Sequence, residues 1–498
     1  MLEFSFASTA VSIAVTPFGY LMLGAVVAVF FVSPSWSYFL LCAAALLQAF
    51  TPLVIAVAGA KYGVPINLFV GPVVCAALFL RAPITGRVHD PMLSLATRVR
   101  HLTPSNLPAI FLVYVATTAL VLPSLFSGLP VMQMLGNVGL HDALQPLRPN
   151  LNHAVQIAHA FTLLMVVLAS WRVSKHYGSE HVSEWILVGL VGAVLLSAVV
   201  TWTQSMIAPE GVTKFVDWFG YNPSYGANYY IYHGGVLGGA RYGLPLSEPS
   251  YTSAIYASTC VGAFAVFLGR KRKRWLWGVV GCLTFCSLLL TGGRTGIFAL
   301  LFSFALATTY MSFLAVKRSV VDGIKLSLVS NWVVMSIAFV LLCVVFAKWL
   351  AVGEYAGALW KSALIKVEEL SFISANDNAR GIANLRALTL LLDTYGLGVG
   401  AGSHRAAGYF FSLLANLGLI GTALFAATLY QQLVVNARIV RGEEHRDSTV
   451  ARFYLGSIGC MTIAAAAAIP DILFPAYWIL LLLGFTSQMM STSQASAH

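Results

Sequence analysis

Apolar residues occupy most of the chain in long blocks, which short polar, basic or glycine-rich segments separate. A helix needs about 20 mostly apolar residues to cross the hydrocarbon core of a bilayer. By this measure the pattern predicts about 12 or 13 transmembrane helices, of which the first is the weakest candidate. The predicted spans are residues 18–33, 36–58, 64–80, 106–126, 152–171, 183–205, 251–269, 275–291, 295–316, 326–347, 407–430, 452–469 and 472–489.

The composition agrees with this pattern. Of the 498 residues, 58% are hydrophobic and 9% are charged, whereas soluble domains carry about 25% charged residues. All seven cysteines fall in apolar blocks without the loop spacing of a metal or disulfide site, so we interpret them as small core residues. The sequence therefore predicts an all-α, polytopic membrane protein and excludes a soluble globular class.

The net charge of +11 has two interpretations, namely a nucleic-acid partner or anchoring of cytoplasmic loops. Five loops hold 18 of the 29 Lys and Arg residues, and they alternate with loops on the other side of the membrane. Cytoplasmic loops are enriched in Lys and Arg, so we favour the second interpretation and expect no nucleic acid. The basic loops are residues 81–104, 172–181, 270–274, 317–325 and 437–452.

Two segments on the opposite, external side are too long to be plain connectors. In the first, apolar positions from Val212 to Phe219 recur at helical spacing, as in a helix that lies on the membrane surface. The second, residues 348–405, ends in a predicted helix and a glycine-rich turn. The segments divide the chain into an N-terminal bundle (1–205), an aromatic-rich loop (206–250), a second group of spans (251–347), a large loop (348–406) and C-terminal spans (407–498).

Arg294 is the only charged residue between Trp275 and Phe313. An unpaired charge at the centre of a bilayer costs at least ~2.5–3.5 kcal/mol, so we place Arg294 in the turn "TGGRTG" between two spans, at the external surface. Glycines permit a tight reversal. The free N–H groups of the next helix and the guanidinium group suit a phosphate or diphosphate. Alternatively, Arg294 only reaches lipid headgroups from a helix end.

Two other segments contain candidate residues. The stretch "SEPSYTS" places Glu248 just before a span, where it acts as a base, an arginine partner or an ordinary helix-capping acid. The stretch "GLGVGAGSHR" leads from four glycines into His404 and Arg405 at the start of another span. A histidine there can accept a proton or bind a phosphate, or make an ordinary polar contact.

The helix before this turn contains two further arginines. Arg380 and Arg386 do not share a helical face, so at most one of them faces the same ligand. Arg386 and Asp393 do share a face and suit a brace within the helix.

Together, the external loops offer several basic side chains beside glycine-rich turns, which predicts a pocket for an anionic, lipid-linked headgroup. The aromatic rings of residues 215–232 suit either stacking on sugars or the interfacial belt of a membrane protein, and we favour the belt for any single ring. The basic candidates are Arg241, Arg294, Arg380, Arg386, His404 and Arg405.

Several catalytic motifs do not occur in the sequence. It contains no P-loop and no HExxH zinc pattern, and its external segments contain no Asp-x-Asp pair. We therefore expect no ATP-driven transport and no metal or other cofactor. Arginines would have to neutralise a leaving diphosphate in place of a metal.

Two stretches resemble the bacterial O-antigen ligase and polysaccharide polymerase family. They are "LLLTGGRTGIFALLFS" and, further along the chain, "YGLGVGAGSHRAAGYFFSLLANLGLIGTALF". The "SEPSYTS" stretch is similar to exopolysaccharide polymerases of the xanthan-polymerase kind. The resemblance covers residues 240–430, and the N-terminal half agrees only in having many spans. It implies a GT-C-like membrane fold and a glycosyltransferase of the bacterial inner membrane with a periplasmic active site.

The resemblance also implies roles for individual residues. Arg294 and one or both of Arg380 and Arg386 would hold the diphosphate of an undecaprenyl-diphosphate-linked oligosaccharide. His404 or Glu248 would orient or deprotonate the acceptor hydroxyl, and attack opposite the diphosphate would invert the anomeric carbon.

Arg405, with His404, matches the basic position that follows the family's glycine-rich turn. Ligases of the family usually carry a His-Asn pair where this chain has Ala407, so the departure favours a polymerase. A separate chain-length regulator in the same membrane is a further implied partner.

The sequence is also compatible with two other functions. An O-antigen ligase differs from a polymerase only in its acceptor. A lipid-linked oligosaccharide flippase or a small-solute transporter would place polar or charged residues near the membrane midplane on broken helices. Here the charges collect in the external loops instead, so we favour an enzyme that works at the membrane surface.

Overall fold

The computed structural model describes most of the chain. The predicted span 326–347 and residues 348–378 of the predicted large loop lie outside the described part, so the predictions made for them stay untested. The described residues are 11–57, 60–82, 106–132, 144–207, 209–223, 231–232, 241–246, 248–269, 274–322, 379–441 and 448–495.

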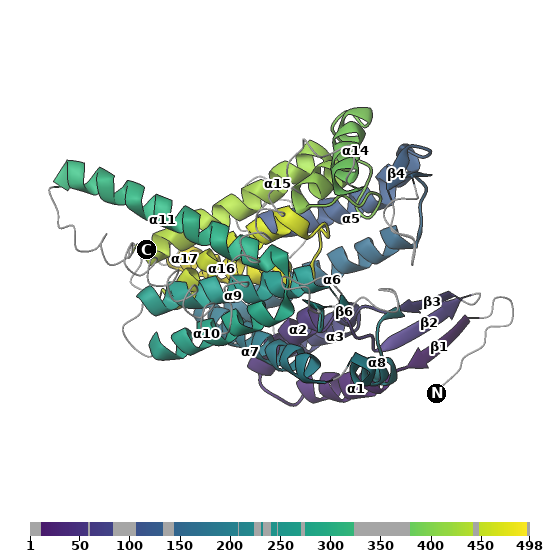
Figure 1. Cartoon of the computed structure of the whole chain (residues 1–498), viewed down its shortest axis with the longest axis horizontal. Coiled ribbons are helices and arrows are strands. Elements are labelled where there is room, and N and C mark those ends of the chain that lie inside the picture. The colour runs from purple at the N-terminus through teal and green to yellow at the C-terminus, as the bar shows by residue number, and fades with distance from the viewer. Residues whose placement is uncertain are drawn as a thin grey trace, which may run out of the picture.

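A bundle of helices makes up most of this structure (Figure 1). Among the described helices, seven are long and apolar enough to cross a membrane. The chain is therefore a mostly helical, multi-pass membrane protein, as its hydrophobic pattern predicts. The seven are α5 (Leu107–Leu125), α6 (Leu151–Tyr177), α7 (Ser179–Met206), α9 (Pro249–Gly269), α10 (Arg274–Thr291), α15 (Tyr409–Val440) and α16 (Thr449–Ala468).

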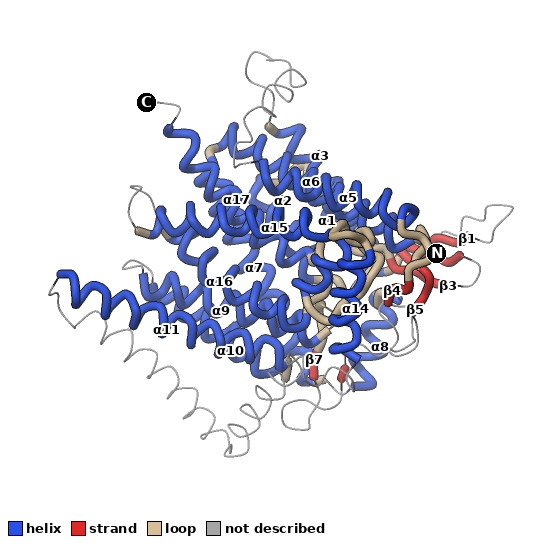
Figure 2. Tube along the Cα trace, turned by 90° about the horizontal axis from the view of Figure 1, so that it is seen from above, coloured by secondary structure: helices blue, strands red, loops and turns tan. Residues whose placement is uncertain are grey.

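Further helices surround these seven. Helix α14 and the strands β1 to β4 lie toward the right of Figure 1, whereas the far end of α11 and the C-terminus lie toward the left. Viewed from above, α14 again lies near the strands (Figure 2). The further helices are α1 (Pro17–Val29), α2 (Pro34–Leu46), α3 (Ile66–Arg81), α8 (Pro209–Phe219), α11 (Arg294–Asp322), α14 (Ala379–Asp393) and α17 (Pro475–Ala495).

Helix α9 packs against α10, α11 and α16. Its backbone approaches α16 closely, because a Cβ atom on Gly262 would lie 2.9 Å from the carbonyl oxygen of Phe453. Membrane helices associate through such small residues, since lipid provides no hydrophobic drive between them. The first turn of α9, from Pro249 to Thr252, is buried in this packing.

The stretch 36–58 does not form the single span that its hydropathy predicts. Helix α2 ends at Leu46, and strand β2 (Leu53–Val57) pairs antiparallel with β1 (Val11–Val15) and β3 (Ala60–Gly63). Pro52 cannot continue a helix, and the β-branched residues after it favour a strand. The prediction of a continuous span was wrong because hydropathy does not distinguish an apolar strand from an apolar helix.

The structure also contains two short β-hairpins that the all-α prediction does not include. Strand β4 (Pro130–Met132) pairs with β5 (Leu144–Pro146), and β6 (Ile231–Tyr232) pairs with β7 (Arg241–Tyr242). The all-α description therefore holds for the bundle and fails for these connections.

Helix α8 confirms the helical spacing predicted between Val212 and Phe219. Val212 and Val216 are buried, whereas Phe215 and Trp218 are 52% and 65% exposed. Large exposed rings beside a buried apolar stripe are typical of a helix at a membrane interface.

Helix α15 is interrupted at Gly418, where φ is 65° and ψ is −163°. The predicted helix and glycine-rich turn before α15 are confirmed as α14 and residues 394–408, and this turn inserts into the interruption. The N–H of Leu419 donates to the Gly396 carbonyl at 2.8 Å, and the N–H of Val399 donates to the Ala415 carbonyl at 2.8 Å. A Cβ atom on Gly398 would lie 2.6 Å from the Gly418 nitrogen, so this contact requires glycine.

The side chain of Asn416 joins the turn to α15. Its Oδ1 atom accepts the N–H groups of Ser403 (3.1 Å) and His404 (2.9 Å). Its Nδ2 atom donates to the carbonyls of His404 (2.8 Å) and Ser412 (2.9 Å). Asn416 is buried, so this side chain satisfies backbone groups that water does not reach.

We expect Asn416→Leu to lower the free energy of unfolding by at least ~2 kcal/mol, because it leaves buried N–H groups of the turn without partners. Thermal unfolding of the protein in detergent measures the effect. Thr428→Val is the control, because the buried Thr428 hydroxyl bonds only to the Leu424 carbonyl one turn earlier in α15. Equal shifts for both variants would contradict a special role for Asn416.

Candidate functional site

The first turn of α9 is polar. The carbonyl of Glu248 accepts the N–H groups of Tyr251 and Thr252, both at 3.1 Å. The Ser250 hydroxyl donates to the Glu248 carboxylate. Glu248 thus occupies the N-terminal cap of α9, where negative charge is favourable, and it remains partly exposed.

The Arg294 turn packs on this first turn of α9. Helix α10 ends at Thr291, α11 begins at Arg294, and Gly292 between them has a φ of 60°, which favours glycine. The N–H of Gly296 donates to the Ser253 hydroxyl at 3.1 Å. The starts of α9 and α11 therefore lie side by side, and the positive ends of two helix dipoles meet there.

Arg294 is partly buried at the start of α11. Its Nε atom is buried and has no hydrogen-bond partner among the residues that the structure describes. A buried donor without a partner is costly, so an anionic group bound at this position would be stabilised.

Asp471 joins this region from the connection between α16 and α17. The Tyr251 hydroxyl donates to Asp471 Oδ2 at 2.6 Å, and the Tyr251 ring packs on Phe474 with 5.0 Å between ring centroids. The side chains of Tyr409 and Trp478 both donate to the Ile472 carbonyl, at 2.9 Å and 3.1 Å. These bonds hold the backbone next to Asp471 in place.

Arg405 reaches the same region from the glycine-rich turn. Arg405, Glu248 and Asp471 all lie close enough to Tyr251 to interact with it electrostatically. The backbone N–H of Arg405 donates to the Met132 carbonyl of β4 at 2.9 Å, which positions the residue. We define the α9 cluster as Glu248, Tyr251, Arg294, Arg405 and Asp471.

The α9 cluster combines two kinds of binding group around one helix start. Arginine and helix N-termini bind phosphate groups. Carboxylates accept hydrogen bonds from hydroxyl groups and accept protons. The cluster therefore suits a ligand in which phosphate and hydroxyl groups are close together.

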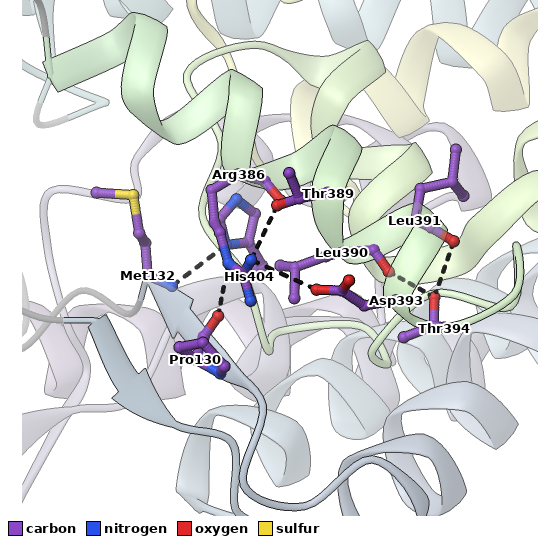
Figure 3. Close-up of polar contacts among 9 residues, drawn as sticks. All are labelled: Pro130, Met132, Arg386, Thr389, Leu390, Leu391, Asp393, Thr394 and His404. Carbon is purple, nitrogen blue, oxygen red and sulfur yellow. Dashed lines mark hydrogen bonds and ion pairs between the residues drawn. The ribbon is translucent and has the colours of Figure 1, made fainter. Parts of the chain in front are cut away.

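His404 belongs to a second group, which lies between α14 and β4 (Figure 3). It is 4% exposed; its Nδ1 atom accepts the N–H of Met132 at 3.2 Å, and its Nε2 atom lies 3.1 Å from the Ala383 carbonyl. Because Nδ1 accepts, Nε2 carries the proton and donates. Both ring nitrogens are therefore engaged with the backbone, and the geometry favours a structural role over the base that the sequence suggests.

Burial lowers the pKa of His404 to about 4. The hydrogen bond to the Ala383 carbonyl acts in the opposite direction, and the nearby charge of Arg386 lowers the pKa. His404 is therefore neutral at physiological pH.

Arg386 is also committed to contacts within the fold (Figure 3). Its Nε atom donates to the Pro130 carbonyl at 2.9 Å, and its Nη1 atom donates to the Thr389 hydroxyl at 2.9 Å. Nη1 also lies 3.4 Å from Asp393 Oδ2, which confirms the brace predicted from their spacing. Arg386 thus joins α14 to the β4 hairpin.

The structure brings two of the residues predicted from the sequence, Glu248 and Arg405, close to Tyr251, and the start of α11 at Arg294 packs on the same turn of α9. It places His404 and Arg386 in the second group. The side chains of Arg241 and Arg380 lie outside the described structure, so their predicted roles stay untested.

The sequence prediction missed Asp471 and Tyr251. Asp471 is the only acidic residue after Asp447, and it lies between two predicted spans at their external ends. An isolated acid in that position was a usable signal. Its hydrogen bond to Tyr251 was not predictable, because 220 residues separate the two partners.

The stability of the protein should fall as the pH decreases from 6.5 to 4. In this window the unfolded state binds a proton at position 404 and the folded state does not, because burial lowers the pKa of His404 to about 4. We expect His404→Gln to reduce this dependence in thermal unfolding across the pH range. His176→Gln, at an exposed position, should retain it; equal pH dependence in wild type and His404→Gln would contradict the assignment.

No protein-family model matches the sequence, and no curated protein matches it significantly. The resemblance to the O-antigen ligase and polysaccharide polymerase family therefore depends on the short motifs of residues 240–430 alone.

Proposed function

We propose that the protein is a polysaccharide polymerase, a membrane glycosyltransferase that joins oligosaccharide repeat units. The donor would be linked to undecaprenyl diphosphate, and a hydroxyl group of an acceptor sugar would attack it at the periplasmic face of the inner membrane. The observation that carries the proposal is that Arg405 and two carboxylates lie near Tyr251 in the first turn of α9, against which the start of α11 at Arg294 packs.

The charges of the cluster support a diphosphate leaving group. Arg294 and Arg405 would neutralise the negative charge that develops as the bond between the anomeric carbon and the diphosphate breaks. The backbone N–H groups at the starts of α9 and α11 would add to this stabilisation. The donor is already activated by its diphosphate, so no nucleotide is needed.

The carboxylates of the cluster support the acceptor side of the reaction. Glu248 and Asp471 are both partly exposed and both lie near Tyr251. A carboxylate beside the acceptor hydroxyl can take its proton during attack. Attack from the face opposite the diphosphate inverts the configuration of the anomeric carbon.

One observation favours a second candidate, a flippase for lipid-linked oligosaccharides. Transporters place broken helices at their substrate sites, and α15 is broken at Gly418. However, backbone groups beside this break are paired with the glycine-rich turn and do not face a ligand. The polymerase is therefore the better supported of the two.

We expect Arg294→Ala to reduce polymer formation about 10²–10³-fold, as the loss of a donor to a developing negative charge does. The assay uses purified protein in lipid with a diphosphate-linked repeat unit, with and without EDTA. Arg274→Ala is the matched control, because Arg274 starts α10 as Arg294 starts α11. Its variant should keep the wild-type rate.

Other outcomes of this assay would change the assignment. Equal rates in Arg294→Ala and wild type would reduce Arg294 to an anchor for lipid headgroups. Loss of product in EDTA would contradict metal-independent transfer. Folded wild-type protein that makes no product, but moves the lipid-linked donor across a vesicle membrane, would support the flippase.

A further inference from the structure

Asp471 lies outside every stretch that carries the family resemblance, whereas its partner Tyr251 lies within "SEPSYTS". Tyr251 donates to Oδ2 of Asp471 at 2.6 Å. The other carboxylate oxygen, Oδ1, accepts no hydrogen bond from the residues that the structure describes, and Asp471 is partly exposed. One oxygen is therefore anchored, and the other is available to a ligand.

Both members of the pair are held rigidly. Tyr251 is buried in the first turn of α9, and its ring packs on Phe474. The residue after Asp471, Ile472, is held through its carbonyl by Tyr409 and Trp478. Such preorganisation lets a catalytic group keep its position without further cost during the reaction.

The surroundings of the pair point to a polar ligand. Arg405 lies within electrostatic range of Tyr251, and His159 of α6 lies within range of Asp471. The Nε2 atom of His159 is buried and has no hydrogen-bond partner among the described residues. Buried polar atoms without partners are rare, and a hydroxyl-bearing ligand or a water molecule next to Asp471 would satisfy this one.

We infer that Asp471, oriented by Tyr251, is the proton acceptor for the hydroxyl group of the acceptor sugar. This inference rests on the proposed polymerase function. The O–H bond of the acceptor breaks as its proton passes to Oδ1 of Asp471, and the oxygen forms a bond to the anomeric carbon of the donor. The bond from that carbon to the diphosphate breaks, and its electron pair leaves with the diphosphate beside Arg294 and Arg405.

Glu248 is the less suitable of the two acids. Its carboxylate already accepts the Ser250 hydroxyl and lies at the positive end of α9, beside the start of α11. The positive end of a helix dipole attracts a carboxylate, so Glu248 is engaged in capping α9. Asp471 lies in a connection outside these helix ends.

The test compares Asp471→Asn and Asp471→Ala with wild type in the polymerisation assay across a range of pH. We expect a loss of about 10²–10⁴-fold in rate, as removal of a general base produces. Binding of undecaprenyl diphosphate, measured by native mass spectrometry, should remain. Added formate should partly restore the rate of Asp471→Ala, because a small carboxylate can take the place of the missing one.

Matched variants separate catalysis from folding. Asp217→Asn changes an exposed acid on α8 and should keep the wild-type rate. Tyr251→Phe should slow transfer about 10-fold, less than the loss of the general base itself, because Tyr251 positions Asp471 and does not take the proton. Tyr454→Phe removes a buried tyrosine hydroxyl that donates to Gln432 in the bundle, and it should leave the transfer rate unchanged. Thermal unfolding confirms that each variant is folded.

Three results would overturn the inference. The first is an unchanged rate in Asp471→Asn, and the second is a loss in Asp471→Ala that formate does not restore. The third is that the rate of Glu248→Gln no longer falls at low pH, whereas the rate of Asp471→Asn still does. In each of these cases an active wild type leaves the polymerase function standing, whereas an inactive wild type removes both proposals.

Discussion

Within a membrane bundle, every backbone N–H and carbonyl group needs a partner from the protein. The interruption of α15 at Gly418 is the place where this constraint shapes the structure most. The glycine-rich turn enters the gap, exchanges backbone hydrogen bonds with residues on both sides, and is joined to α15 by Asn416. Arg405 owes its position near the start of α9 to this arrangement.

Three of the basic residues predicted from the sequence divide into two groups by what they contact. Arg386 bonds to the β4 hairpin and to Asp393, and neutral His404 bonds to the backbone on both sides of its ring. Arg294 retains a buried nitrogen without a partner in the described structure. Arg386 and His404 therefore stabilise the fold between α14 and β4, whereas Arg294 has a donor that is available to an anion.

The hydrophobic pattern was sufficient to predict most of the helices, because the length of an apolar block reflects the thickness of the bilayer. It also placed Arg294 in a turn, since a charge inside a span is costly. It failed at residues 53–57, where apolar residues form a strand, because hydropathy alone carries no information on backbone pairing. The spacing of Arg386 and Asp393 was informative because the contact lies within one helix.

The sequence by itself determined that the chain crosses the membrane repeatedly and that its charges collect outside the spans. It also marked Glu248, Arg294 and Arg405 as residues beside helix starts. Only the tertiary structure decided that Glu248 and Arg405 lie near Tyr251 and that the start of α11 packs on the same turn of α9. It also decided that His404 is buried and engaged, and that Asp471 joins Tyr251. The physical reason is that such contacts depend on how helices from distant parts of the chain pack, which local periodicity does not encode.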